Sequence, residues 1–229
     1  MSLADKIYFL LLLLTLASYL VKLNRQEKFI RWITILLSFW LVATLAAVLL
    51  PLNGVIRNNL FIYHIITPVE FTLILLLYRS YFENTVIKRI LIYSIPIFIL
   101  LCIVFSLFVQ KTDVSNSYTS IIESAVIISV SLLFLKETAQ LQRVKSLVHY
   151  PMFWISVAIL FGYTAPLIIE GMLNYLIDQS MKLAQQLYLI SYFSNYILLI
   201  LFMIAIFCDR RPYTNINKPV IKSPVHGKQ

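Results

Sequence analysis

Charged residues are scarce in this sequence, and so are glycine and proline. Only 13% of the 229 residues are Asp, Glu, Lys or Arg, whereas 60% are hydrophobic, and there are 4 glycines and 8 prolines. A soluble domain needs more polar surface than this to cover its core. The few helix-breaking residues leave long apolar runs uninterrupted. These shortages exclude an ordinary soluble protein and indicate an integral membrane protein whose main contact is the lipid bilayer.

Recognisable catalytic and cofactor motifs are missing as well. The sequence has no glycine-rich phosphate loop, no G-x-S-x-G serine motif and no H-E-x-x-H zinc motif. It has 3 histidines, and only one of them lies within an apolar run, so a multi-histidine zinc site cannot be assembled. We therefore expect no enzymatic activity, no cofactor and no bound metal. The net charge of +9 is expected to set membrane orientation rather than to bind nucleic acid.

Seven apolar runs are long enough to cross a bilayer as helices, which takes about 20 residues each. They cover approximately residues 7–22, 32–50, 59–78, 90–110, 117–135, 152–176 and 185–207. The connections are short, so consecutive helices are antiparallel and no soluble domain fits between them. The predicted fold is an all-α, polytopic bundle of seven transmembrane helices over residues 1–208, followed by a basic tail over residues 209–229.

Basic residues alternate strongly between the two sides of this topology. Fifteen of the 19 Lys and Arg residues follow the first, third, fifth and seventh runs. Since positive loops stay in the cytoplasm, the amino terminus is predicted outside and the carboxyl terminus inside. Residues 15–18 would suit cleavage of a signal peptide, but cleavage would leave the next basic cluster outside. We therefore expect the first run to stay as a membrane anchor.

Ionisable residues within the runs fall in the outer half of the membrane or at its midplane. At a rise of about 1.5 Å per residue, His64 lies about 8 Å and Glu70 about 16 Å below the outer end of the third helix. Glu123 lies about 8 Å down the fifth helix, and Glu170 about 6 Å down the sixth. Polar residues also share helical faces, and such faces normally point into the bundle or into a water-filled cavity.

The sequence thus predicts an outward-facing polar pocket for ligand binding or proton sensing. Pro68 and Pro166 lie beside two of its glutamates and favour local bends that open space. The residues predicted to line the pocket are Tyr63, His64, Thr67, Glu70, Glu123, Tyr163, Glu170, Ser191 and Asn195.

A purely structural role for each of these carboxyl groups remains an alternative. Glu70 would also suit a hydrogen bond that joins two helices. Glu123 would suit a solvated acid near a helix start, where the helix dipole favours it. Glu170 would suit the membrane interface, where a carboxylate costs little.

Two stretches carry a family resemblance. "YPMFWISVAILFGYTAPLI" (150–168) and "LYLISYFSNYILLILFMIAIFC" (187–208) resemble the last two helices of small, uncharacterised seven-helix membrane proteins of Bacteroidota. Related membrane modules resemble the sensor halves of some histidine kinases. The resemblance implies a sensor in the cell inner membrane and transfers no catalytic residue. Because the chain ends about 20 residues after the last run, the signal would pass to a separate protein.

The first functional hypothesis is therefore a sensor or accessory signalling subunit with a cytoplasmic partner. A proton- or cation-coupled transporter is the alternative, in which Glu70 and Glu123 would carry the ion. A membrane-embedded enzyme is the third. The absence of charge from the inner half of the helices argues against a continuous polar path, and so favours the sensor.

Overall fold

The computed structural model describes residues 3–25, 27–54, 59–110, 116–140, 147–179 and 181–208 of the chain. Within these ranges, the side chains of Arg25 and of residues 173–188 are not described. The predicted basic tail, 209–229, lies outside the described residues, so its contact with a partner stays a prediction.

The described residues form seven long helices and no strand. The helices are α1 (Leu3–Val21), α2 (Lys28–Leu52), α3 (Leu60–Tyr81), α4 (Thr85–Val104), α5 (Ser117–Gln140), α6 (Pro151–Gln179) and α7 (Met181–Phe207). A short π-helix, η2 (Phe105–Val109), continues α4. All seven long helices are apolar enough to cross a membrane. The prediction of an all-α fold with seven such helices is confirmed.

Four helices begin four or five residues earlier than the apolar runs indicate. α1, α2, α4 and α7 begin at residues 3, 28, 85 and 181, whereas the predicted spans begin at residues 7, 32, 90 and 185. The added first turns carry basic residues. A search for apolar runs leaves such residues out, although the helix itself can continue through them beyond the bilayer. At α4, the Asn84 side chain fixes the start by accepting hydrogen bonds from the backbone N–H groups of Val86, at 2.9 Å, and Ile87, at 3.3 Å.

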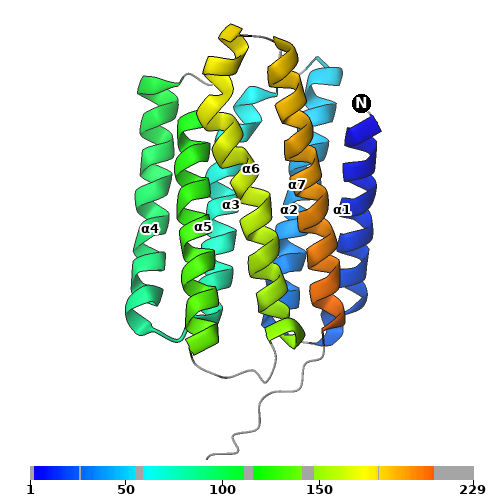
Figure 1. The fold of residues 1–229 in the computed structure, drawn as a ribbon, viewed down its shortest axis with the longest axis vertical. Coiled ribbons are helices and arrows are strands. Elements are labelled where there is room, and N and C mark those ends of the chain that lie inside the picture. Colours follow the sequence, from blue (N-terminus) through cyan, green and yellow to red (C-terminus); the bar gives the residue numbers. More distant parts are fainter. Residues whose placement is uncertain are drawn as a thin grey trace, which may run out of the picture.

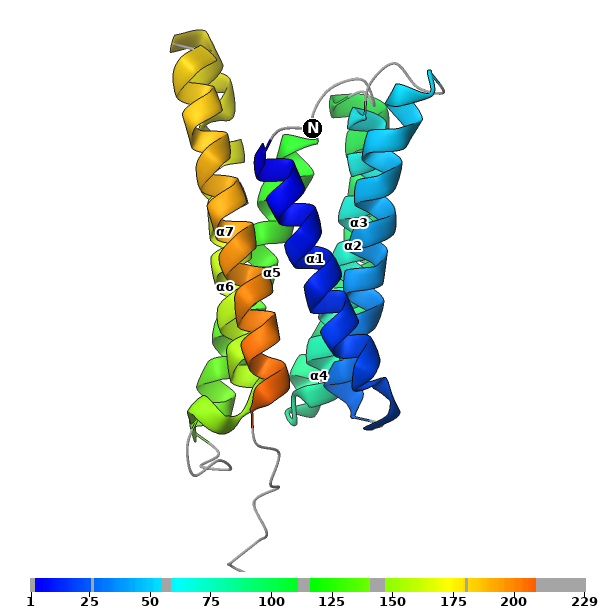
Figure 2. The ribbon, with the colours of Figure 1, turned by 90° about the vertical axis from the view of Figure 1, so that its right-hand side faces the viewer.

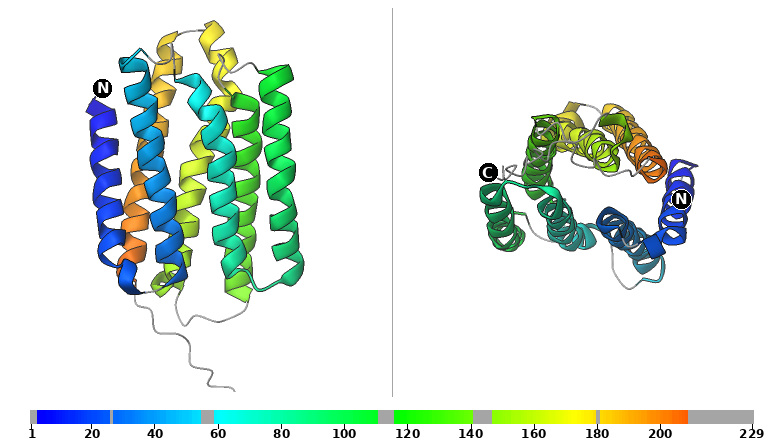
Figure 3. Two further views of the ribbon diagram at one scale, coloured as in Figure 1. Left: turned by 180° about the vertical axis from the view of Figure 1, so that it is seen from behind. Right: turned by 90° about the horizontal axis from the view of Figure 1, so that it is seen from below.

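Six helices form a closed ring, in which each contacts the next in the order α1, α2, α3, α5, α6, α7 and back to α1. Figure 1 shows this bundle from the side, and Figure 3 shows the ring from one end. α4 lies outside the ring and packs against α3. The interior is therefore enclosed by helices other than α4, although α4 lies between α3 and α5 in the chain.

Large apolar side chains fill the half of the ring remote from the start of α1. Tyr78 and Phe82, at the end of α3, pack with Phe134 of α5, and their ring centroids lie 5.4 to 6.3 Å apart. Trp40 of α2 stacks on Phe202 of α7, with centroids 6.1 Å apart and planes within 3°. These rings leave little space between the helices, so this half is a packed core.

Lys22, directly after α1, holds α1 against the end of α7. Its Nζ atom donates a hydrogen bond of 2.9 Å to the backbone oxygen of Ile206 and lies 4.5 Å from the ring centroid of Phe207. A cation is stabilised at the C-terminal end of a helix by the helix dipole, and over an aromatic ring by the ring's negative face. The first and last helices therefore meet at this end, and α6 and α7 diverge from α1, α2 and α3 toward the other (Figure 2).

Phe134→Ala should destabilise the bundle, because it empties the centre of the aromatic cluster. Truncation of a packed phenylalanine costs about 3 kcal/mol or more of unfolding free energy. The measurement is an unfolding titration of the purified protein in detergent. Phe161→Ala is the matched control, since Phe161 is 51% exposed and Phe134 is 2% exposed. Equal losses in the two variants would show that the packed half is not the stable core.

Candidate functional site

A cavity of about 700 Å³ lies inside the ring, in the half where α1 begins. The six ring helices contribute its walls, and no described residue of α4 lines it. Asp5, in the first turn of α1, and Asn59, just before α3, lie at its outer end. Glu70 and Tyr163, close to the packed core, lie at its inner end. The cavity thus runs from the helix ends toward the middle of the bundle.

Small residues create this space. Along α2, the cavity side presents Ala43, Thr44 and Ala47, whereas the packed half of the same helix buries Ile33 and Leu37. On α6, Gly162 lines the cavity. A Cβ atom at Gly162 would clash with the side chain of Leu198 on α7, so glycine lets α6 and α7 approach closely. The change from large to small side chains along each helix turns a packed core into a cavity.

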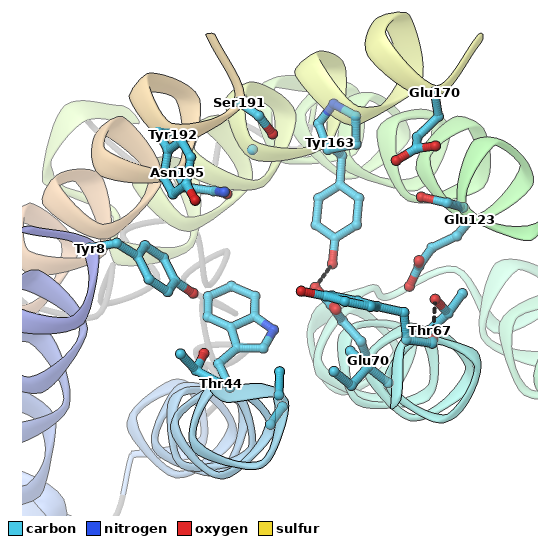
Figure 4. A pocket seen from close by; sticks show the side chains of 18 of the residues that line it. Tyr8, Thr44, Thr67, Glu70, Glu123, Tyr163, Glu170, Ser191, Tyr192 and Asn195 are labelled. Atoms are coloured by element: carbon cyan, nitrogen blue, oxygen red, sulfur yellow. Dashed lines mark hydrogen bonds between the residues drawn. The ribbon is translucent and has the colours of Figure 1, made fainter. Parts of the chain in front are cut away.

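Glu70 is hydrogen-bonded to a side chain of another helix. The Tyr163 hydroxyl of α6 donates a hydrogen bond to its Oε1 atom, and Trp40 of α2 lies near the same carboxyl group. Figure 4 shows the Tyr163–Glu70 bond crossing the cavity. A hydrogen bond between buried polar side chains joins helices within a membrane bundle, so Glu70 joins α3 to α6.

Glu123 and Glu170 differ from Glu70, because each has a carboxyl oxygen without a partner. Glu123 Oε1 and Glu170 Oε2 are buried and make no hydrogen bond. The Glu123 side chain is only 4% exposed, which excludes the reading of a solvated acid near a helix start. Both residues line the cavity, and their carboxyl groups face the same space as Glu70 (Figure 4). This is the chemically unsatisfied part of the site.

Thr67 has a mainly structural role, together with an asparagine that the sequence analysis missed. Asn116 Nδ2, just before α5, donates to Thr67 Oγ1 at 2.7 Å and to the backbone oxygen of Tyr63 at 3.2 Å. Thr67 in turn donates to the same Tyr63 oxygen at 3.0 Å. These bonds pin the start of α5 to α3. The Tyr63 side chain, 42% exposed, lines the cavity beside them.

His64 does not line the cavity. Its Nδ1 atom lies 2.7 Å from Ser106 Oγ in η2, on the face of α3 that meets the α4 segment. The sequence analysis counted His64 among the residues of the pocket, and the structure corrects this by placing it against η2. The π-helix brings Ser106 to it, and no sequence signal indicated this contact. The other eight predicted residues line the cavity.

The wall formed by α1, α2 and α7 is rich in hydroxyl groups. Ser191, Tyr192 and Asn195 of α7 face the cavity, as do Tyr8 of α1 and Thr44 of α2 (Figure 4). Tyr8 and Thr44 lie within hydrogen-bonding reach of each other.

Asp5 is the fourth acidic residue of the cavity. It accepts a hydrogen bond of 2.5 Å from Tyr192 Oη. Asp5 was missed because the first apolar run was read from residue 7. Tyr8 lies inside that run and was passed over as one more tyrosine, although its spacing of three residues from Asp5 places both on one helical face.

The arrangement can bind and position a ligand, and it offers no metal centre within the described part of the chain. There, no three His, Cys, Asp or Glu side chains come together as ligands of a metal ion would.

Comparisons with family models, curated proteins and solved structures find no match to this chain. The resemblance to Bacteroidota sensor-like proteins therefore stays a prediction, and the site alone has to indicate the function.

The Tyr163–Glu70 bond predicts a specific energetic coupling. Tyr163→Phe removes a donor from a buried carboxyl group, which should cost about 1 to 3 kcal/mol of unfolding free energy. In a Glu70→Leu background the same change should cost much less, since the acceptor is gone. Unfolding in detergent of the four proteins of this cycle gives the coupling energy, expected at about 1 kcal/mol or more.

Tyr93→Phe is the control for loss of a hydroxyl, because Tyr93 is 67% exposed on α4. It should match the wild type. Additive effects of Tyr163→Phe and Glu70→Leu would contradict the bridge.

Proposed function

We propose that this chain is a multi-pass membrane protein that senses a small molecule in the cavity and signals to a separate cytoplasmic partner. One observation carries the proposal: a cavity of about 700 Å³ with acidic and hydroxyl-bearing walls occupies one half of the bundle, above a packed core. Cavities of this size suit small organic ligands. A chamber closed at one end suits binding and release on the same side.

The distribution of charge supports an outward-facing cavity. Among the described residues, the basic side chains near the packed end include Lys22, Lys28, Arg79 and Lys88, whereas the cavity end has Lys6. Positive residues near helix ends remain in the cytoplasm. On this basis the cavity faces away from the cytoplasm, the amino terminus is outside, and the membrane is the cytoplasmic one.

The pair α6–α7 is the proposed moving part. Ser194 of α7 donates a hydrogen bond to the backbone oxygen of Phe161 on α6, and Gly162 allows close packing of the two helices. They would therefore move as one body. A ligand that contacts α3 and α5 on one side and α6 and α7 on the other has a higher affinity when these walls are closer together. Binding then shifts the population toward a closed cavity, and the packed end of α7 transmits the shift.

One observation favours the transporter as a second candidate. Beyond the inner end of the cavity, Tyr78 Oη donates a hydrogen bond of 2.7 Å to Ser131 Oγ, and Ser156 lies within hydrogen-bonding reach of Tyr78. Buried hydroxyl groups thus continue past Glu70 into the packed half. A proton pathway would use such groups, so the two functions have to be separated by experiment.

Thiol labelling tests both the cavity and its orientation. With Cys102 and Cys208 replaced by alanine, we expect Ser191→Cys and Ser120→Cys to react with a membrane-impermeant maleimide added to intact cells. Both positions line the cavity. Ser131→Cys is the control, because Ser131 is fully buried in the packed half and should stay unlabelled. Labelling only after permeabilisation would reverse the proposed orientation, and its complete absence would refute an open cavity.

Reconstitution separates the sensor from the transporter. In liposomes containing a pH-sensitive dye, the sensor should add no proton flux beyond that of protein-free vesicles. Protein-dependent flux that Glu70→Gln abolishes and Glu83→Gln preserves would favour the transporter instead. Glu83 is a suitable control because it is exposed and lies at the opposite end from the cavity.

A further inference from the structure

The charge of the cavity wall is one-sided. Four acidic residues, Asp5, Glu70, Glu123 and Glu170, line it, and no Lys, Arg or His is found among the described residues of the wall. Two of the acids already have donors within the protein, Glu70 from Tyr163 and Asp5 from Tyr192. Such a wall repels anions and attracts cations.

The remaining two acids lack donors. Glu123 Oε1 and Glu170 Oε2 are buried without a hydrogen bond, and Glu123 is more than nine-tenths buried. A buried polar atom without a partner is costly, and a carboxylate oxygen is a strong acceptor. The two residues belong to adjacent helices, α5 and α6, and face one space. A group that carries both positive charge and N–H donors would complement both oxygens.

Aromatic side chains form another part of the wall. Tyr8, Trp40, Tyr163 and Tyr192, from α1, α2, α6 and α7, line the cavity. Aromatic faces bind the apolar body of a ligand and also attract a neighbouring cation. The cavity therefore combines an acidic region with an aromatic region, and its volume leaves room for more than an ion.

We propose that the cavity binds a protonated organic amine, whose ammonium group is held by Glu123 and Glu170 while its apolar or aromatic body lies against the aromatic wall. The inference rests on the proposed function, since it names the ligand class of the same cavity. The unpartnered oxygens are hydrogen-bond acceptors, and a protonated amine supplies N–H donors together with positive charge, whereas a quaternary ammonium ion supplies the charge alone. In the described part of the chain, no three His, Cys, Asp or Glu side chains come together as the ligands of a metal ion would, so the cavity offers no protein-built coordination sphere.

The test uses the full-length protein in lipid nanodiscs and measures thermal unfolding with four probes of one shape. The probes are 2-phenylethylamine, its N-trimethylated quaternary analogue, 2-phenylethanol and 3-phenylpropionate. We expect the amine to raise the unfolding temperature with saturation, the quaternary analogue to do so at a concentration about tenfold higher or more, and the alcohol and the carboxylate to have no effect.

Two variants locate the ammonium group. Glu123→Gln and Glu170→Gln keep the side-chain shape and should each weaken amine binding by about tenfold or more, because a charged acceptor is lost. Without a ligand, both variants should be about as stable as the wild type, since the unpartnered oxygens make no hydrogen bond within the protein that the substitution would break. Glu83→Gln is the matched control and should leave both quantities unchanged.

Three results would overturn the inference. The first is the absence of any amine-dependent shift. The second is an equal or larger shift with the alcohol or the carboxylate, which would leave the cavity a binding site of different chemistry. The third is ligand-free destabilisation by the Gln variants with unchanged amine affinity, which would make the two acids structural. Failure of the proposed function itself is distinct from all three, because it appears as missing thiol labelling or as flux in liposomes.

Discussion

A polar side chain inside a membrane-spanning helix needs a partner within the protein, because lipid offers none. Glu70 and Tyr163 meet this need together, and their hydrogen bond crosses the ring between α3 and α6. The bond lies where small residues give way to the aromatic core. On one side of it the helices pack fully, and on the other their polar faces diverge around a cavity. The two halves of the bundle thus depend on one buried pair.

The helices were predictable from sequence because their signal is local. A run of about 20 apolar residues leaves few alternatives to a membrane-spanning helix, and all seven runs are helices in the structure. The polar faces were predictable for a related reason. Once the helix period is fixed, Glu70, Tyr163 and Asn195 have to point inward to avoid lipid, and all three line the cavity.

The order of helices around the ring was not predictable, because it depends on packing between distant segments. Short loops indicate that consecutive helices are antiparallel, yet α4 lies outside the ring and α3 meets α5 directly. Because α4 lies outside the ring, His64 of α3 faces Ser106 of η2 rather than the cavity. This placement also explains Asn116, whose bond to Thr67 exists only because α5 starts beside α3. Contacts between segments that are distant in the chain leave no periodic pattern in the sequence.

The three glutamates show why burial alone does not identify a functional residue. Glu70 has a donor from Tyr163, so a purely structural account is sufficient for its position. Glu123 is more deeply buried than Glu70, and one of its carboxyl oxygens has no donor. One oxygen of Glu170 also has no donor. Selection for stability alone would replace such groups with amides or apolar residues, which cost less when buried. Their presence around a cavity is explained when a bound molecule supplies hydrogen-bond donors to these oxygens.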